Sequence, residues 1–290
     1  MNVGVVGNPS HRGLDAVLAR LAAAAPRHGL TLATESAIAD LWPEPRPPLL
    51  EPGAIPDFLV TLGGDGTLLR GAHFLDGAQT PLLGVNLGRV GFLTTATAQT
   101  LEKALDAIAR GAYTTEARRT LQPLIEDATG HTRAEPLVLN DVVLHKGGVA
   151  RVLRLRVVVQ GEEVAQYSAD GIIVATPTGS TAYSLSAGGP IVVPGVDAIV
   201  ITAICPHTLA VRPIVVPAAV EVVVEPLAPL ASDLMLSFDG QVSVSLEPGH
   251  RLRVRQGERR VQLVHLGPEG YFARMRGKLH WGDLSDRERG

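Results

Sequence analysis

Cysteine is nearly absent from this chain of 290 residues, whose one thiol is Cys205. A single thiol excludes a disulfide within the chain and favours a reducing compartment, so we expect a cytoplasmic protein. The N-terminus also lacks the basic and apolar regions of a signal peptide, which favours the same compartment. Because apolar residues precede Cys205 at 201–204, we expect the thiol to be buried and inert.

Aromatic residues, long apolar runs and an excess of charge are also lacking. Phe, Trp and Tyr make up 4% of the chain and hydrophobic residues 46%, so aliphatic side chains must fill the core. No apolar run reaches membrane-spanning length without an interrupting glycine, proline or charge. The formal net charge of −3 argues against nucleic acid or an anionic membrane as a partner. We expect the short basic clusters to be ordinary solvated faces: 118–119, 251–255, 259–260 and 274–276.

The N-terminal part of the chain alternates between strand and helix patterns. A proline-rich stretch at 42–56 interrupts them and is expected to form a surface loop. Such alternation predicts a parallel sheet with helices on its faces. The predicted strands are 3–6, 29–33, 57–60 and 81–86, and the predicted helices are 14–24, 68–74 and 100–110.

Helical periodicity fades after Gly111, and short β-branched runs follow. Many short strands predict an antiparallel, sandwich-like domain, and the runs on either side of Gly257 are interpreted as a hairpin. We therefore place an α/β domain at 1–112, with 271–290 packing back on it, and a β-rich domain at 113–270. The predicted strands are 137–139, 142–144, 152–159, 172–174, 191–193, 214–216, 220–224, 251–254 and 261–264.

A glycine-rich turn with one carboxylate at its centre, Thr61-Leu-Gly-Gly-Asp-Gly-Thr67, follows a predicted buried strand. Backbone amides free of Cβ atoms at the start of a helix can hold phosphate. Asp65 would repel phosphate, so we expect it to hold a metal ion, accept a proton or bind a hydroxyl, which favours kinase chemistry. The turn fits neither the Walker loop pattern GxxxxGK[ST] nor the dinucleotide-binding pattern GxGxxG. The alternative is a tight turn with Asp65 as a helix cap.

Two further polar clusters lie in the β-rich half. The segment 176–186, Thr-Pro-Thr-Gly-Ser-Thr-Ala-Tyr-Ser-Leu-Ser, is dense in hydroxyls beyond what helix capping needs, which favours nucleoside or sugar recognition. Asn140-Asp141 stands in an otherwise apolar run, where polar side chains need a ligand or an internal network. The histidines show no metal-ligand spacing, so we expect no structural zinc site.

The order and spacing of Gly63-Gly-Asp-Gly-Thr67, Asn140-Asp141 and Thr176–Tyr183 resemble those of the NAD kinases. The glycine turn alone is weak, because lipid kinases and phosphofructokinases carry similar turns, whereas the combination is specific. The resemblance covers nearly the whole chain. Its further pieces are 86–93, 205–209, 212–215, 238–241 and 278–282.

The resemblance implies transfer of a phosphoryl group from ATP or polyphosphate to the adenosine ribose 2′-hydroxyl of NAD, giving NADP. It implies a Rossmann-like α/β domain and a β-sandwich-like domain with the site between them, and a homodimer or homotetramer. A divalent cation, Mg²⁺, is expected to arrive with the nucleotide, because no dedicated set of metal ligands is evident.

The same resemblance assigns residue roles. Asp65 would orient the acceptor hydroxyl and take its proton, which an aligned carboxylate can do in a loose transition state. The donor phosphates would lie on Gly63, Gly64, Gly66 and Thr67. Phe92 would form an apolar wall of the adenine site. The remaining NAD-binding residues would be Asn140, Asp141, Asp170, Thr178, Thr181, Ala182, Tyr183 and Ser186.

Two other functions remain open from the sequence. A lipid or sphingoid kinase could use the same glycine turn, but it would need an apolar acceptor pocket in place of the hydroxyl-rich segment 176–186. A non-catalytic dinucleotide sensor could keep the fold, but it would have no use for the carboxylate of Asp65.

Overall fold

The computed structural model describes residues 1–51, 53–88, 91–148, 152–208, 210–227, 234–267 and 270–279. The chain divides into two compact units, Met1–Ala117 with Gln262–Gly290, and Arg118–Val261. The boundaries between the units fall inside two long strands, β6 (Thr114–Glu126) and β17 (Arg251–His265). Part of the predicted motif 278–282 lies outside the described residues, as do Arg89, Val90 and Leu209.

The first unit is built on a parallel sheet, as the alternating sequence predicted. The strand order is β17–β4–β3–β1–β2, and every neighbouring pair is parallel. The strands that belong wholly to this unit are β1 (Asn2–Gly7), β2 (Thr31–Thr34), β3 (Phe58–Leu62), β4 (Pro81–Asn86) and the short β5 (Ala96–Thr97). Its helical elements are α1 (Leu14–Ala24), η1 (Ala25–His28), η2 (Ser36–Leu41), α2 (Asp65–Phe74), η3 (Ala98–Thr100), α3 (Leu101–Ala109) and α5 (Tyr271–Leu279).

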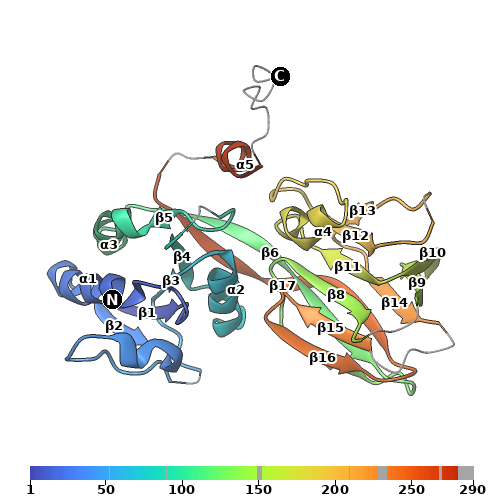
Figure 1. Ribbon diagram of the computed structural model, residues 1–290, viewed down its shortest axis with the longest axis horizontal. Helices are drawn as coiled ribbons and strands as arrows, with labels where there is room; N and C mark the ends of the chain where they lie inside the picture. The colour runs from blue at the N-terminus through green and yellow to red at the C-terminus, as the bar shows by residue number, and fades with distance from the viewer. Residues whose placement is uncertain are drawn as a thin grey trace. The chain divides into compact units, whose positions relative to one another are not determined.

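Helices cover both faces of this sheet. Alternate strand residues point to opposite sides, and all residues of β3 are buried, so both faces need cover. Val60 and Leu62 share a buried core with residues of α1 and α3. Leu59 and Thr61 instead approach Gly71 of α2. Figure 1 accordingly shows β1, β3 and β4 between α1 and α2. This doubly covered parallel sheet confirms the predicted Rossmann-like α/β domain.

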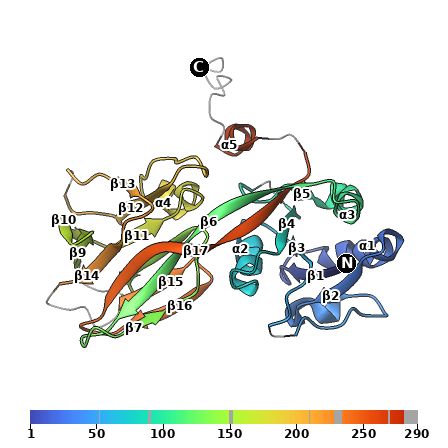
Figure 2. The same ribbon diagram turned by 180° about the vertical axis from the view of Figure 1, so that it is seen from behind.

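The second unit contains two antiparallel sheets, which confirms the predicted β-rich domain. One sheet has the order β13–β12–β11–β8–β15–β16, and the other contains β10–β9–β14–β17 with β6 and β7. Figure 2 shows β6 and β17 side by side, as their pairing requires. The elements are β7 (Thr132–Ala134), β8 (Asp141–Lys146), β9 (Leu153–Val159), β10 (Glu162–Ala169), β11 (Gly171–Ala175), η4 (Gly179–Thr181), α4 (Tyr183–Ser186), β12 (Ala198–Ile204), β13 (Ile214–Pro217), β14 (Val222–Pro226), β15 (Leu234–Phe238) and β16 (Val242–Leu246).

Both faces of the central strand β11 are buried, which explains its continuous apolar sequence. Ile172 and Val174 belong to the core between the two sheets. Ile173 lies in a smaller core on the outer face, against which Ala187 and Val192 pack. The segment that follows β11 therefore folds back over the sheet and covers it.

Three sequence-based expectations about strands need correction. The runs on either side of Gly257 form one continuous strand, β17, rather than a hairpin. The run 191–193 has no strand structure, and 137–139 contributes only an isolated bridge between Val138 and Leu121. A Cβ at Gly257 would lie 2.2 Å from Thr120 Oγ1, so this glycine permits a close approach of β6 rather than a turn.

Candidate active site

The glycine-rich turn joins β3 to the first turn of α2. The helix begins at Asp65 with Gly64 as its N-cap, and no side chain caps it. Gly64 and Gly66 are exposed, whereas Gly63 and Thr67 are buried against each other. The exposed backbone at a helix N-terminus offers amide donors and a positive dipole end to an anion. The turn can therefore bind phosphate through its backbone, while the Thr67 side chain packs against Gly63.

The carboxylate of Asp65 does not cap its own helix, so the structural alternative for this residue is wrong. It accepts hydrogen bonds from the backbone amides of Phe92, at 2.8 Å, and Leu93, at 3.1 Å. Those amides belong to the segment after β4, which the sequence did not connect with Asp65. A carboxylate has about four lone-pair positions, so Asp65 can accept a further hydroxyl while it holds this segment.

In the second unit, Asn140 and Asp141 are buried at the start of β8. The carboxylate of Asp239 accepts the backbone amides of Leu139, Asn140 and Asp141, at 2.8, 2.7 and 3.0 Å. Asp239 and Gly240 adopt positive φ angles of 52° and 64° in the turn between β15 and β16. The Asp239 side chain therefore fixes the backbone that carries both predicted NAD-binding residues.

Burial and the nearby Asp239 carboxylate raise the pKa of Asp141 from its ordinary value to about 7. Burial is the larger cause, because a charged carboxylate loses solvation inside the protein. The side-chain oxygen of Asn140 is also buried, and no described residue donates a hydrogen bond to it. A buried acceptor of this kind is costly unless a ligand or water meets it. The pair therefore has the character of a polar binding site.

The hydroxyl-rich segment uses many of its hydroxyls internally, which reduces the excess that the sequence suggested. The Thr176 hydroxyl donates to the Leu139 carbonyl at 2.6 Å, and the Ser180 hydroxyl donates to the Pro177 carbonyl at 2.7 Å. The hydroxyls of Ser184 and Thr202 lie 2.8 Å apart. None of these residues was among the predicted NAD ligands. Their bonds make the segment a rigid support for its neighbours.

The predicted NAD ligands of this segment and of β8 lie in the same unit. A Cβ at Gly179 would lie 2.1 Å from the Asn140 carbonyl oxygen, so this glycine lets the segment approach β8 closely. The Thr181 hydroxyl donates to the Thr178 carbonyl at 3.2 Å. Ala182 is half-buried, and Tyr183 and Ser186 are exposed. The exposed side chains are accessible to a ligand.

Two other predicted residues have clear surroundings. Asp170 is half-buried and forms an ion pair with Lys146, whose ammonium lies 2.6 Å from it. Phe92 is half-buried in the first unit, and its own backbone amide donates to the carboxylate of Asp65. The structure brings Phe92 and Asp65 together, and it brings Asn140, Asp141 and Gly179 together.

Sequence reasoning missed Asp239 and Arg118 as parts of the site. Asp239 belongs to the piece 238–241 of the family resemblance, but it was given no role, and an Asp-Gly turn gives no sign of its contacts with the distant Asn140 and Asp141. Arg118 was expected on a solvated face, but it is 2% exposed and donates to the Thr178 hydroxyl at 3.3 Å. Arg274 is likewise buried, at 8% exposure. The prediction that Arg118 and Arg274 lie on solvated faces was therefore wrong.

The expectation for Cys205 was also wrong, because the thiol is exposed. The apolar residues before it belong to β12, which ends at Ile204, and Cys205 turns away with a φ of 46°. Among the described residues, no group of three or more His, Cys, Asp and Glu side chains could hold a metal ion. Within the same residues, no helix is long and apolar enough to cross a membrane.

Comparisons with known proteins agree with this geometry. Residues 53–113 match the family model of the ATP-NAD kinase N-terminal domain, and residues 139–266 match that of the ATP-NAD kinase C-terminal domain. The chain is 46% identical over 288 residues to an NAD kinase of Gemmatimonas aurantiaca, and the match covers 99% of each chain.

Two solved structures resemble nearly the whole chain. A yeast NADH kinase complexed with NADH aligns with a TM-score of 0.86 and 26% identity, covering 97% of this chain and 88% of the other. An NAD kinase from Archaeoglobus fulgidus in complex with ATP aligns with a TM-score of 0.75 and 26% identity, covering 97% and 99%.

Proposed function

The chain belongs to the NAD kinase family, and from this membership we propose how its residues act in the reaction. The enzyme transfers a phosphoryl group to the adenosine ribose 2′-hydroxyl of NAD and forms NADP. One observation supports the proposed catalytic role most directly. The carboxylate of Asp65 stands in the first turn of α2 beside the exposed Gly64 and Gly66, held at both oxygens by backbone amides.

Asp65 is proposed to orient the acceptor hydroxyl and to take its proton. Phosphoryl transfer passes through a loose transition state, so alignment and charge neutralisation supply most of the catalysis. The hydrogen bonds from the backbone amides of Phe92 and Leu93 fix the carboxylate before the substrate arrives. The hydroxyl oxygen, once aligned, attacks the terminal phosphorus of the donor while its proton passes to Asp65. The bond from that phosphorus to the bridging oxygen breaks, and the donor leaves one phosphate shorter.

We propose ATP as the donor, with its phosphates on the turn formed by Gly63, Gly64, Gly66 and Thr67, in which Gly64 and Gly66 are exposed. The helix N-terminus and the absence of Cβ atoms support this role. The described residues contain no protein cage for a metal ion, so the proposed Mg²⁺ would be held by phosphate oxygens and water. It would neutralise the charge of the triphosphate. Polyphosphate would present the same chemistry to the turn.

NAD is proposed to bind through the buried polar pair of β8 and the support next to it. The Asn140 oxygen is a buried acceptor that a donor on the adenosine half would satisfy, and Asp141 would accept from ribose hydroxyls. Phe92 would supply an apolar wall. The remaining proposed contacts come from Asp170, Thr178, Thr181, Ala182, Tyr183 and Ser186.

The donor is tested with purified protein, NAD and either ATP or polyphosphate in a coupled assay for NADP. We expect NADP to form with ATP and Mg²⁺, and chelation of the metal ion to stop the reaction. Turnover with polyphosphate and none with ATP would refute ATP as the donor. We also propose a cytoplasmic homodimer or homotetramer, which size-exclusion chromatography with light scattering would test.

Asn140→Ala is expected to raise the KM for NAD about tenfold with little change in kcat, because it removes one hydrogen-bonding group from a buried site. Steady-state kinetics at saturating ATP would measure both constants. The matched control is Gln166→Ala on the exposed face of β10, which should leave both unchanged. An unaltered KM in Asn140→Ala would contradict the proposed contact.

The raised pKa of Asp141 predicts a pH dependence of NAD capture. Below about 7 the carboxyl is protonated, and above it the carboxylate accepts ribose hydroxyls, so kcat/KM for NAD should rise through this pH. At one unit below the pKa we expect about a tenth of the plateau value. Asp141→Asn should remove this inflection, and Asp239→Asn should move it to lower pH because one neighbouring charge is lost.

The Asp141 carboxyl should make the free energy of unfolding change with pH in the direction opposite to kcat/KM. Its pKa is raised in the folded state, so between the ordinary value of 3.8 and about 7 the folded chain binds more protons than the unfolded chain. The contribution of Asp141 to the free energy of unfolding should therefore fall as pH rises through that window. Denaturant unfolding of wild type and Asp141→Asn at several pH values measures it. An equal slope for both proteins would contradict the assigned pKa.

A further inference from the structure

The segment between β4 and β5 supplies the backbone amides that hold the carboxylate of Asp65. The Phe92 amide donates to one oxygen at 2.8 Å, and the Leu93 amide donates to the other at 3.1 Å. Gly91 also approaches closely, because a Cβ on it would lie 1.9 Å from Asp65 Oδ1. The position of the carboxylate therefore depends on the backbone conformation of this segment and on the contacts that fix it.

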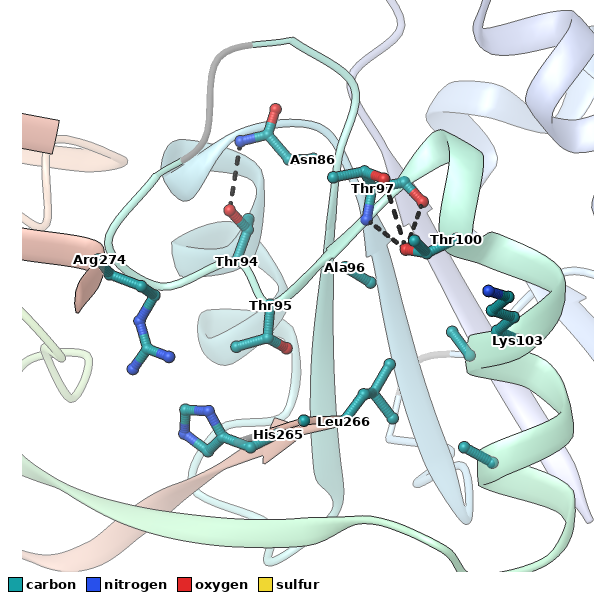
Figure 3. A pocket seen from close by; sticks show the side chains of 13 residues that line it. Asn86, Thr94, Thr95, Ala96, Thr97, Thr100, Lys103, His265, Leu266 and Arg274 are labelled. Atoms are coloured by element: carbon teal, nitrogen blue, oxygen red, sulfur yellow. Dashed lines mark hydrogen bonds between the residues drawn. The ribbon is translucent and has the colours of Figure 1, made fainter. Parts of the chain in front are cut away.

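Asn86, the last residue of β4, bonds to this segment through both ends of its side-chain amide. It is buried, at 4% exposure. Its oxygen accepts the Gly88 amide at 2.6 Å, and its nitrogen donates to the Thr94 hydroxyl at 3.2 Å. Because the Gly88 backbone amide can only donate, the Asn86 oxygen must face it and the nitrogen must face Thr94. Figure 3 shows this nitrogen directed at the Thr94 hydroxyl, beside a cavity that both residues line.

The Thr94 side chain fixes the segment near its other end. Thr94 is 3% exposed, and its hydroxyl accepts the Gly91 amide at 3.3 Å as well as the Asn86 amide. A hydroxyl oxygen has two lone pairs, so these two donors occupy both of its acceptor positions. Thr94 therefore holds the backbone amide next to that of Phe92, and Asn86 connects Thr94 to the start of the segment.

Both residues are anchored on the parallel sheet. Asn86 ends β4, and the Thr95 backbone amide donates to the Gly84 carbonyl of the same strand at 3.1 Å. A Cβ on Gly84 would lie 2.8 Å from Thr94 Cγ2 and 3.0 Å from its Cα, so this glycine lets Thr94 pack directly against β4. The neighbouring strand β3 leads into the turn that carries Asp65. The contacts of Asn86 and Thr94 therefore relate the segment to the strand beside the catalytic turn.

Polar side chains at these two buried positions contribute direction more than stability. A buried polar group loses its solvation, and replacing two hydrogen-bonded partners by apolar groups of the same shape can be nearly neutral. Packing alone would therefore not require Asn86 and Thr94. Their hydrogen bonds to the Gly88 and Gly91 amides set the path of the backbone between them. Such control suits a backbone that must present the next two amides at defined positions.

We propose that Asn86 and Thr94 are positioning residues of the phosphoryl transfer. They hold the segment in the conformation in which its amides orient the Asp65 carboxylate toward the acceptor hydroxyl. This role rests on the proposed function of Asp65 as the base. Without the pair, the amides shift and the carboxylate rotates, so the hydroxyl is aligned less often. The loss should appear mainly in kcat, because all proposed NAD contacts except Phe92 lie in the second unit.

Thr94→Val tests the proposal, because it removes the hydroxyl and keeps the volume and branching of the side chain. We expect kcat to fall about 30-fold, within the roughly 10²-fold loss that a misplacement of about 1 Å can cause. The KM for NAD should change less than about threefold. Thr94→Ser keeps the hydroxyl and should retain nearly normal kcat. Steady-state kinetics at saturating ATP and Mg²⁺ measure these constants, and wild-type kcat in Thr94→Val would overturn the proposal.

Thr95→Val is the matched control from the next residue. It removes a hydroxyl that donates to the Val264 carbonyl at 2.7 Å, and this bond holds no amide of the segment. Denaturant unfolding should show a similar loss of stability in Thr95→Val and Thr94→Val, while kcat should stay nearly normal in Thr95→Val. An equal loss of kcat in both variants would overturn the proposal. Asn86→Ala is the second variant if Thr94→Val does not fold, and it should reduce kcat at least as far because it removes both contacts of Asn86.

The coupling to Asp65 is measured by adding Thr94→Val to Asp65→Asn. On this background the loss from Thr94→Val should shrink to at most about threefold, because both changes act on one group. The full loss on both backgrounds would overturn the link to the carboxylate. A large loss in Asp65→Asn with wild-type kcat in Thr94→Val would overturn the positioning role alone. Near-normal kcat in Asp65→Asn would instead refute the proposed function of the carboxylate, and the positioning role with it.

Discussion

Asp65→Asn is expected to reduce kcat about 10³-fold, because general base catalysis by a positioned group contributes roughly 10²–10⁴. The substituted side chain is almost the same size and retains one acceptor oxygen for the amides of Phe92 and Leu93. It cannot take the proton of the ribose hydroxyl. The KM for NAD should change little, since the proposed adenosine contacts lie on Asn140 and Asp141. Steady-state kinetics with purified protein would measure both.

Loss of one of the two amide hydrogen bonds is the expected side effect of this substitution. It should lower the free energy of unfolding by about 1 kcal/mol, which leaves the fold intact. Asp57→Asn is the matched control, because Asp57 also binds a backbone amide, that of Asn2 at 2.7 Å, at an exposed position. Near-normal kcat in Asp65→Asn would remove this residue from the proton transfer.

The regular elements were the most predictable part of the fold. The helix Leu14–Ala24 and the strand Pro81–Asn86 occupy the predicted residues, because apolar periodicity and flanking prolines mark both clearly. Gly257 misled the prediction, since a glycine that permits close strand contact and one that permits a turn look the same in sequence. The contact depends on Thr120, far away in the chain.

The site was predictable where its chemistry lies within one short motif. Asp65 stood out because a carboxylate among phosphate-binding glycines conflicts with simple phosphate binding. Its bonds to Phe92 and Leu93, and those of Asp239 to the backbone around Asn140, join segments distant in sequence. No local pattern encodes such contacts. The predicted burial of Cys205 was wrong for a related reason, because its apolar neighbours belong to a strand that ends before it.

Gly91→Ala is expected to reduce kcat about 10²-fold without removing any catalytic group. A Cβ at Gly91 would lie 1.9 Å from Asp65 Oδ1 and 2.4 Å from its Cγ, so the carboxylate must move. A misplacement of about 1 Å at a reacting group can reduce the rate about 10²-fold. The obstructing atoms are the end of a side chain, which can rotate, so the free energy of unfolding should fall only slightly. Kinetics and denaturant unfolding of the same preparation measure both quantities.

Gly88→Ala is the matched control from the same segment, because among the described residues a Cβ there meets only Asn86 Oδ1, at 3.9 Å. It should keep nearly normal kcat. In the double variant Gly91→Ala with Asp65→Asn, the loss should be close to that of Asp65→Asn alone, since both changes act on one group. If the two losses multiply instead, Gly91 acts on catalysis independently of Asp65, and the carboxylate does not depend on this segment for its position.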